Sequence, residues 1–168
     1  ASMNGPAFAC AGEPVQFTNI STPVFTNSIW DFGAGQTSNS THVFHNPGTY
    51  TVMLISEDGP CRDTAYRNIT IRQRPTVNFT HVPLEPCPAP VTVNFAGTGA
   101  TTYSWSFGGS GANPSFTYTT NGAYTVTMVG TDANGCKDTA QKSFTIHPWN
   151  MVLDSDTPGG CAPIPITF

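Results

Sequence analysis

The cysteines are the residues of this sequence with the widest chemical options. They could form disulfides, ligate a metal or act as nucleophiles, and the chain has five of them: Cys10, Cys61, Cys87, Cys136 and Cys161. No pair forms the C-x-x-C pattern of a redox or zinc site. An odd number of cysteines in an exported protein leaves one thiol without a partner inside the chain, so their spacing must be explained by the organisation of the whole sequence.

Histidine and acidic residues offer few options for a metal site. His42 and His45 form an H-x-x-H pattern, but on a strand residues three apart point to opposite faces, so we interpret them as packing residues. Calcium needs six to eight oxygen ligands, and the chain has 10 acidic residues and no D-x-D-x-D-G loop. Asp154 and Asp156 are the remaining candidates for a calcium site, and no other cofactor is expected.

Composition argues against several classes of function. The sequence contains no nucleophile elbow, P-loop or H-E-x-x-H motif, so we expect no enzymatic activity. The net charge of −4 and only 6 Lys plus Arg provide no basic surface for nucleic acid or an anionic membrane. The sequence contains no run of 18 apolar residues of the kind that could span a bilayer, so we expect no membrane insertion.

The sequence repeats itself at a spacing of about 75 residues. Four blocks recur 74 or 75 residues apart: Trp30–Gly33 with Trp105–Gly108, Gly48–Val52 with Gly122–Val126, Cys61–Ala65 with Cys136–Ala140, and Ile69–Ile71 with Phe144–Ile146. The chain therefore holds two copies of one module, and we expect a third copy to begin after them. We place the boundaries at residues 1–73, 74–148 and 149–168.

The repeat gives each complete module one cysteine near its start and one near its end. The predicted disulfides are therefore Cys10–Cys61 and Cys87–Cys136, and Cys161 lacks its partner because the third copy is truncated. Each bridge would close a loop of about 50 residues, worth roughly 4 kcal/mol in the chain-entropy model. Disulfides persist in oxidising compartments, so we expect an extracellular or cell-surface location.

The hydrophobic pattern within each module has a period of two. Apolar residues alternate with threonine and other residues over 50–55, 91–95 and 124–129, and no helical period occurs. The 16 Gly and 15 Pro suit frequent turns between short strands. We therefore predict an all-β protein made of tandem two-sheet sandwiches.

The aromatic residues of the repeated blocks are predicted to form the core of each sandwich. Phe32 and Phe107 follow Trp30 and Trp105 at a spacing of two, which places them on the same face of a strand. The alternative is that the indoles are platforms for sugar rings. The predicted core aromatics are Trp30, Trp105, Phe32, Phe107, Tyr50 and Tyr124.

These blocks resemble the PKD-type immunoglobulin-like domain. That family has Trp-Asp-Phe-Gly-Asp-Gly, then His-x-Tyr, then Pro-Gly-x-Tyr-x-Val; here they correspond to Trp30–Gly35, with alanine for the second acid, His42–Phe44 and Asn46–Val52. The second copy departs further, at Trp105–Gly109 and Phe116–Tyr118. The form with two cysteines per module looks like that of long surface proteins of Bacteroidota.

The resemblance implies a rigid β-sandwich used as a spacer or adhesive repeat. Some such proteins belong to gliding filaments exported by type IX secretion, and other members of the family accompany catalytic domains in secreted proteases and chitinases. The repeated Asp63–Ala65 and Asp138–Ala140 also match the Asp-Ser/Thr-small-apolar site of O-glycosylation in Bacteroidota, which makes Thr64 and Thr139 candidate glycan sites. The alternative is that the acid and threonine satisfy a turn where a strand starts.

The predicted function follows from the short linkers. Ile71 is followed closely by Arg72-Gln73-Arg74-Pro75, which limits hinge motion. We therefore expect a non-catalytic structural or adhesive segment of an extracellular protein or filament shaft. Its expected partners are neighbouring repeats and other copies in a fibre, with a glycan or another cell-surface ligand as a further candidate. The alternatives are a polysaccharide- or protein-binding module with exposed aromatics at Phe25, Tyr66 or Trp149, or an accessory domain of a secreted hydrolase.

Overall fold

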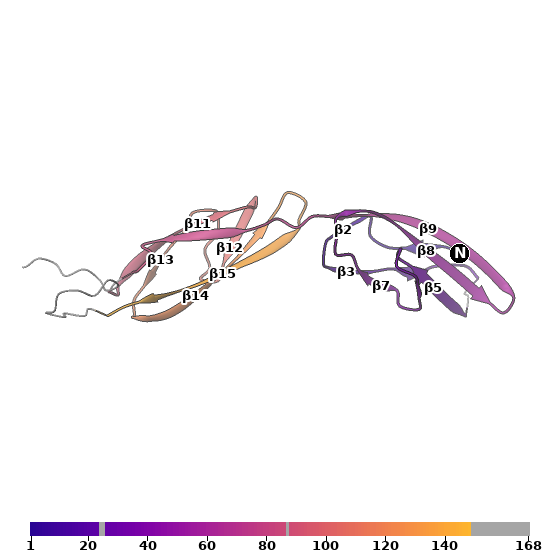
Figure 1. The fold of residues 1–168 in the computed structure, drawn as a ribbon, viewed down its shortest axis with the longest axis horizontal. Coiled ribbons are helices and arrows are strands. Elements are labelled where there is room, and N and C mark those ends of the chain that lie inside the picture. Colours follow the sequence, from indigo (N-terminus) through magenta and orange to yellow (C-terminus); the bar gives the residue numbers. More distant parts are fainter. Residues whose placement is uncertain (24–25, 87, 149–168) are drawn as a thin grey trace, which may run out of the picture. The chain divides into compact units, whose positions relative to one another are not determined.

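The computed structural model describes residues 1–23, 26–86 and 88–148, which form two units (Figure 1). The first unit is Ala1–Arg74, and the second begins at Pro75. Each unit has its own sheets and its own hydrophobic core, as expected of a domain that can fold alone.

Most strands of the first unit join one sheet. Its described strands are β1 (Met3–Asn4), β2 (Phe8–Cys10), β3 (Pro14–Gln16), β4 (Thr18–Asn19), β5 (Asn27–Asp31), β6 (Gln36–Thr37), β7 (Thr41–Val43), β8 (Gly48–Asp58) and β9 (Cys61–Arg72). The main sheet has the order β2-β9-β8-β5-β6, while β3 pairs with β7 and β1 pairs with β4.

The long hairpin of β8 and β9 forms the centre of this sheet. Val52 and Leu54 are fully buried, Met53 between them is half-buried, and Thr51 before them is exposed. The period of two in the sequence therefore gives the strand one more buried and one less buried face. The strands pair as far as Asp58 and Cys61, and a two-residue turn at Gly59-Pro60 connects them. The hairpin therefore places Cys61 at one extreme end of the sheet.

Strand β2 pairs with β9 in parallel, so an early strand lies beside the end of the last one. Cys10 is opposite Arg72 in this pairing. The amide of Thr70 donates to the carbonyl oxygen of Ala7 at 3.0 Å, and the amide of Ala11 donates to that of Arg72 at 2.9 Å. The pairing fixes Cys10 at the C-terminal end of the unit.

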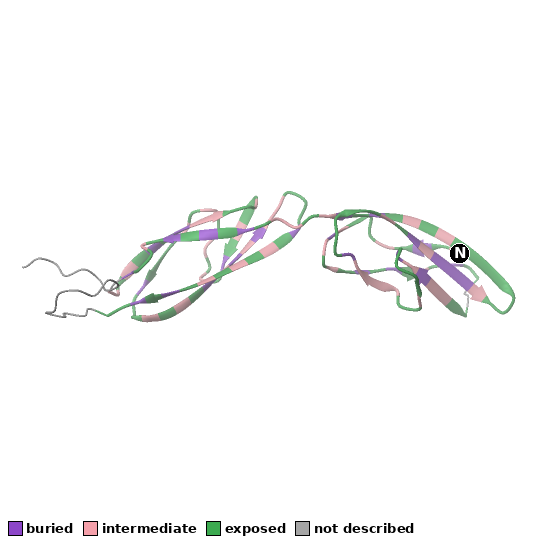
Figure 2. Cartoon of the chain, viewed as in Figure 1, coloured by how far each residue is buried: buried purple, intermediate pink, exposed green. Residues whose placement is uncertain are grey.

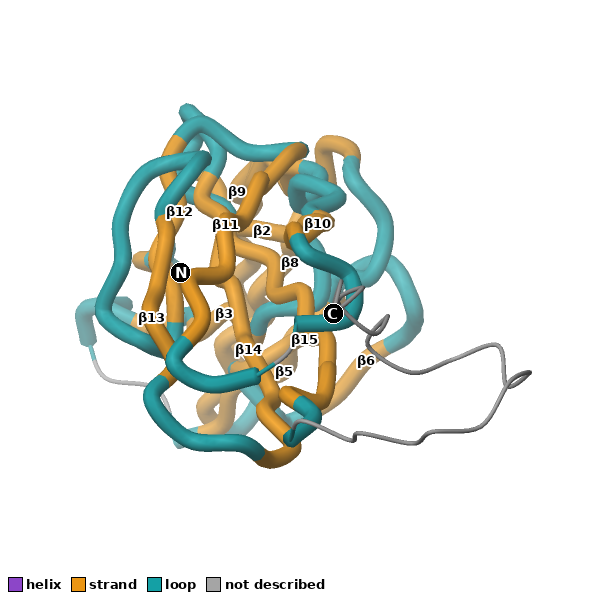
Figure 3. The backbone as a smooth tube through the Cα atoms, turned by 90° about the vertical axis from the view of Figure 1, so that its left-hand side faces the viewer, coloured by secondary structure: helices purple, strands orange, loops and turns teal. Residues whose placement is uncertain are grey.

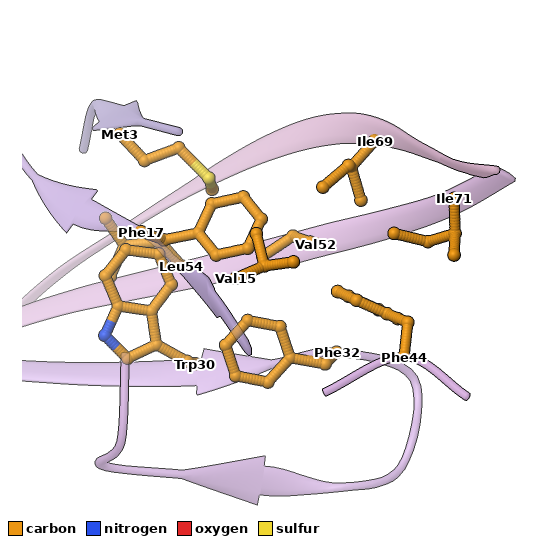
Figure 4. Close-up of a cluster of buried hydrophobic side chains, with 10 residues drawn as sticks. All are labelled: Met3, Val15, Phe17, Trp30, Phe32, Phe44, Val52, Leu54, Ile69 and Ile71. Atoms are coloured by element: carbon orange, nitrogen blue, oxygen red, sulfur yellow. The ribbon is translucent and has the colours of Figure 1, made fainter. Parts of the chain in front are cut away.

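Aromatic rings fill the core of the first unit (Figure 4). The ring of Phe17 lies 6.1 Å from that of Trp30 and 5.7 Å from that of Phe32, between centroids. Aliphatic side chains from β8 and β9 cover these rings. The buried cluster consists of Met3, Val15, Phe17, Trp30, Phe32, Phe44, Val52, Leu54, Ile69 and Ile71.

The second unit is a sandwich of two three-stranded sheets. Its described strands are β10 (Asn78–Val82), β11 (Val91–Thr98), β12 (Thr102–Trp105), β13 (Ser115–Tyr118), β14 (Gly122–Thr131) and β15 (Lys137–Ile146). One sheet has the order β10-β11-β13 and the other β12-β14-β15. Both contribute to one core: Val77, Phe79, Val93, Phe95, Trp105, Tyr118, Val126, Met128, Phe144 and Ile146.

Burial alternates along the strands of both units, as Figure 2 shows. Val93 and Phe95 on β11 are buried and the intervening Asn94 is exposed. Within the described ranges the chain consists of strands and loops and contains no helix (Figure 3). The prediction of an all-β protein made of sandwiches is confirmed.

Candidate functional site

Both tryptophans of the described ranges lie inside their units. Trp30 is 2% exposed and Trp105 is 5% exposed, and the indole N–H of Trp105 donates to the carbonyl oxygen of Gly111 at 2.9 Å. Phe32 is 4% exposed and stacks on Trp30, whereas Phe107 is half-buried against Trp105. A buried ring cannot offer a face to a sugar, so these indoles act in packing.

Tyr50 and Tyr124 fasten the turns that precede them. Each is half-buried, and each hydroxyl donates to a carbonyl oxygen four residues earlier. The acceptor is Asn46 at 3.0 Å in the first unit and Thr120 at 2.8 Å in the second. Such a bond stabilises the turn at the start of β8 or β14.

His42 packs in a row of aromatic rings. Its ring stacks on Phe32 at 4.7 Å and meets Phe44 edge-on at 4.6 Å, both between ring centroids. Burial, and secondarily the charge of His45, lower the pKa of His42. The second unit places Phe116 against Phe107 at 5.1 Å in the same way. Among the described residues no three His, Cys, Asp or Glu side chains gather as a metal site.

The second unit has a hollow of about 340 Å³ lined by aromatic rings. Phe116 is 37% exposed at this hollow, and threonines border it. Burial, and secondarily Tyr124, raise the pKa of Tyr118, so its hydroxyl stays protonated and can donate a hydrogen bond. The aromatic lining consists of Phe107, Phe116, Tyr118 and Tyr124.

The predicted disulfide Cys10–Cys61 is wrong. Cys10 is disulfide-bonded, but Cys61 is a free and exposed thiol. The physical reason is the register: Cys10 lies opposite Arg72, whereas Cys61 lies at the other end of β9. Eleven residue steps along β9 span about 36 Å at roughly 3.3 Å per residue, and a disulfide joins Cα atoms less than about 7 Å apart.

Cys136 is disulfide-bonded as well, in the turn between β14 and β15. The carboxylate of Asp132 holds this turn by accepting the amides of Asn134 and Cys136 at 2.8 and 2.9 Å. The other cysteine of the predicted pair, Cys87, lies outside the described residues, as does Cys161. The candidate calcium ligands Asp154 and Asp156 and two of the three candidate exposed aromatics, Phe25 and Trp149, also lie outside them.

The N-terminal end of each unit is attached to an aspartate that follows the hairpin cysteine by two residues. The amino terminus of Ala1 contacts the carboxylate of Asp63. In the second unit the amide of Val77 donates to the carboxylate of Asp138 at 3.3 Å. Asp63 also accepts the amide of Thr64 at 2.8 Å. The hairpin turn is therefore the N-terminal end of each unit.

The two candidate glycan sites occupy exposed positions. Thr64 on β9 and Thr139 on β15 are both exposed. They lie opposite Ile55 and Val129 in their hairpins. Both hydroxyl positions are therefore accessible to a modifying enzyme.

The last residue of the first unit and the first residues of the second are each held within their own unit. The guanidinium of Arg74 forms an ion pair with Glu13 of the first unit, with 3.4 Å between Nη2 and Oε1. A Cβ on Gly99, whose φ is +92°, would lie 1.9 Å from the carbonyl oxygen of Thr76. Only glycine at position 99 lets the backbone at Thr76 pack this closely inside the second unit.

Sequence reasoning missed a polar cluster between β4, β5 and β8 of the first unit. The Ser56 side chain is fully buried, and its hydroxyl accepts from Asn19 at 3.0 Å and lies 3.2 Å from the hydroxyl of Ser21. The amide of Asn19 also donates to Ser28 at 2.9 Å. The one available signal was a serine directly following the apolar residues of a predicted core strand.

His81 is a second residue whose surroundings the sequence did not indicate. It is 9% exposed, its Nδ1 lies 3.0 Å from the carbonyl oxygen of Pro83, and its ring packs on Phe144 at 4.7 Å. These contacts describe a core residue of the second unit.

No helix among the described residues has the length and apolar character to cross a membrane.

Comparisons with known proteins place these modules in a family. The family model for the PKD domain matches residues 1–72 and 73–147. Collagenase ColA of Bacillus cereus is 34% identical over 88 residues, which covers 48% of this chain and 9% of the collagenase.

Solved structures with similar folds have low sequence identity to this chain. The fibronectin(III)-like modules of Clostridium thermocellum CbhA are 7% identical, with 94% of this chain and 100% of that chain covered and a TM-score of 0.47. Three N-terminal domains of the outer capsid protein Hoc of bacteriophage RB49 are 20% identical, with 88% and 57% covered and a TM-score of 0.35. The two family matches together span nearly all of the described residues, and the chain belongs to the PKD domain family.

Proposed function

We propose that this chain is a non-catalytic, extracellular repeat segment that acts as part of a stiff shaft in a surface protein or filament. The observation that carries the proposal is the anchored linker. Arg74 is held by Glu13 of the first unit, and Val77 is held by Asp138 of the second. Little chain remains free between these anchors, which favours reach over flexible binding.

Surface chemistry supports the same proposal. Hydrogen bonds between hydroxyl or amide side chains link exposed positions of neighbouring strands, as expected of a shaft that meets mainly water. Such pairs join Thr92 to Thr117 at 2.9 Å, Thr125 to Ser143 at 2.8 Å and Thr51 to Asn68 at 2.9 Å. Cross-strand pairs of this kind each add a few tenths of a kcal/mol to about 1 kcal/mol.

Small-angle X-ray scattering tests the shaft function. The unaltered chain should give a narrow distribution of maximum dimension, and a variant with eight Gly/Ser residues inserted after Pro75 should give a broader one, because the anchors no longer limit the linker. The replacement Glu13→Gln is a milder control that removes one anchor. Equal distributions for the unaltered chain and the insertion variant would refute a stiff linker.

A polysaccharide-binding module is the second candidate, and the aromatic hollow of the second unit favours it. Rings such as Phe116 can stack on sugars while the surrounding threonines accept hydrogen bonds. A glycan array followed by calorimetry tests it. Binding that Phe116→Ala abolishes and Tyr66→Ala leaves unchanged would favour this function, since Tyr66 is exposed elsewhere, on β9 of the first unit.

An accessory domain of a secreted hydrolase is the third candidate. It is supported by the similarity to a collagenase over 88 residues. Hydrolysis of gelatin by the full-length protein, and its loss of affinity for insoluble collagen when residues 1–148 are deleted, would favour this candidate. A full-length protein that shows neither property would exclude it.

The cellular setting forms part of the proposal. We place the chain outside the cell, as the family and its disulfide-bonded cysteines favour. The sequence resemblance adds a surface protein of gliding Bacteroidota, exported by type IX secretion, with O-glycans at Thr64 and Thr139. The acidic residues Asp154 and Asp156 add calcium as the one candidate cofactor. Deletion of the gene in such a bacterium should abolish surface filaments or gliding, and unchanged filaments and motility would remove this setting.

A further inference from the structure

Each unit leaves the outer edge of its last strand largely open. Among the described residues of the second unit, β15 is the end strand of its sheet and pairs with β14 alone. In the first unit β2 covers β9 only from Thr70 to Arg72. Neither β9 nor β15 contains proline or glycine, which commonly interrupt an edge. Each edge therefore offers a row of backbone donors and acceptors to another strand.

The open backbone groups of β15 belong to its odd-numbered residues. On β14 the carbonyl oxygen of Thr127 accepts the amide of the residue that follows β12, at 2.9 Å. Its neighbour Met128 therefore bonds toward β15, where it pairs with Ala140. Because the direction alternates along a strand, the amides and carbonyl oxygens of Thr139 and Gln141 point outward.

Two opposite charges lie symmetrically about the middle of this edge. Asp138 and Lys142 flank Ala140, and the three half-buried side chains share one face of β15. When a second β15 pairs antiparallel with Ala140 opposite its own copy, Asp138 of each strand lies opposite Lys142 of the other. These residues are not hydrogen-bonded through the backbone in such a pair, so their Cα atoms lie about 4.5 Å apart. The edge is therefore complementary to itself.

The same charges select one register. A shift by two residues places Asp138 and Lys142 opposite uncharged residues, and a shift by four places one of them opposite its own copy. A shift by one brings outward backbone groups against inward ones. One charge alone would repel an identical strand, which is how many edges are protected. Two opposite charges at symmetric positions attract it instead.

The first unit repeats this pattern on β9. Asp63 and Arg67 flank Ala65 on one face of the strand. The amide of Thr70 bonds away from β8, at 3.0 Å, so the even-numbered residues point outward and the charges have the same place relative to them. In the described part of the chain the Nε of Arg67 is buried without a hydrogen-bond partner, and neither Arg67 nor Lys142 forms an ion pair. Both cations can therefore take a carboxylate from a second copy.

We propose that copies of this chain associate side by side through these edges, by antiparallel pairing of the last strands of their units. At β15, Asp138 of one copy lies opposite Lys142 of the other. At β9, Asp63 lies opposite Arg67 in the same way. The contact is lateral, so it is independent of whether the array acts as a shaft or as a binding module.

Sedimentation velocity of the unglycosylated 168-residue chain over a concentration series tests the proposal. Iodoacetamide first blocks exposed thiols such as Cys61, so that oxidation cannot join the copies. The unaltered chain should associate. The acidic variant Arg67→Glu/Lys142→Glu places like charges opposite each other at both edges, which should weaken association by roughly tenfold or more. Arg62→Glu/Lys137→Glu changes the net charge equally at positions that face uncharged residues, and should associate like the unaltered chain.

A basic variant supplies the complementary arm. Asp63→Lys/Asp138→Lys should stay monomeric alone, but its mixture with the acidic variant should associate, because every acid then lies opposite a base. On association, amide exchange followed by nuclear magnetic resonance should slow at Thr139 and Gln141, whose amides bond the second copy. Circular dichroism verifies the fold of each variant, and the acidic variant with its control decides the test if the basic one does not fold.

Four results would each overturn the proposal. They are a monomeric unaltered chain, whose edges would then be open to a strand of another protein, an acidic variant that associates normally, folded acidic and basic variants that do not associate, and association without protection at Thr139 and Gln141. None of these results bears on the stiffness of the linker, which small-angle scattering measures separately.

Discussion

Replacement of Leu54 by alanine tests whether the two units fold on separate cores. Leu54 is fully buried on β8 and pairs with Trp30 across the sheet. Burial of this kind makes a leucine-to-alanine change cost about 3 to 5 kcal/mol. A unit of 74 residues has a total stability of roughly 4 to 11 kcal/mol, so Leu54→Ala should remove a large part of it.

The second unit offers a matched control, because Met128 is fully buried and pairs with Trp105 in the same way. Each variant should weaken its own unit only. Hydrogen exchange read by mass spectrometry over a urea series reports each unit separately. With a urea slope of about 1 kcal/mol/M and a loss of about 3 to 5 kcal/mol, the midpoint of the altered unit should fall by about 3 to 5 M.

Two results would refute the reasoning. A loss below about 1 kcal/mol in Leu54→Ala would show that the side chain does not fill the core as described. Equal loss of protection in residues 1–74 and 75–148 would show that the units unfold as one body. Met128→Ala, measured in the same way, should lower protection in residues 75–148 only, which controls for an effect of the assay that acts on both units.

Three further predictions concern single positions. Burial lowers the pKa of His42 in the folded state, so the unfolded chain takes up a proton there at a higher pH than the folded chain does. The free energy of unfolding should therefore decrease as pH drops below about 6.5. Urea titrations of His42→Phe, which has the side chain of the second unit at this position, should lack this decrease. Gly99→Ala should destabilise the second unit by more than Gly135→Ala, since both have positive φ but only the first would clash, with the backbone of the linker; equal melting temperatures would contradict the packing. Intact mass of the chain purified from its native cells should exceed the sequence mass by whole sugars, and by less in Thr64→Ala or Thr139→Ala; an unmodified mass would exclude these glycan sites.

The strands were predictable because their side chains obey a simple alternation. Thr51 and Val52 differ in burial as the period of two requires, and the repeat identified equivalent strands in both units. Buried polar positions such as Ser56 were not predictable, because their partners, Asn19 and Ser21, come from a distant part of the chain.

The disulfide pairing failed for a reason of geometry. Spacing in the sequence correctly identified one cysteine near the start and one near the end of each module, but start and end in sequence are not neighbours in space. Strand β2 pairs in parallel with β9, which moves Cys10 to the C-terminal end of the unit, and the hairpin moves Cys61 to the N-terminal end. Strand direction decides this, and the sequence pattern alone does not reveal direction.

The same parallel pairing has a mechanical consequence. When a repeat is pulled from its two termini, β2 is drawn toward the N-terminal side and β9 toward the C-terminal side. The hydrogen bonds from Thr70 to Ala7 and from Ala11 to Arg72 lie across the direction of pull. Rupture therefore requires these bonds to shear together instead of opening one after another, so the first unit should resist tension far better than its thermodynamic stability alone would indicate.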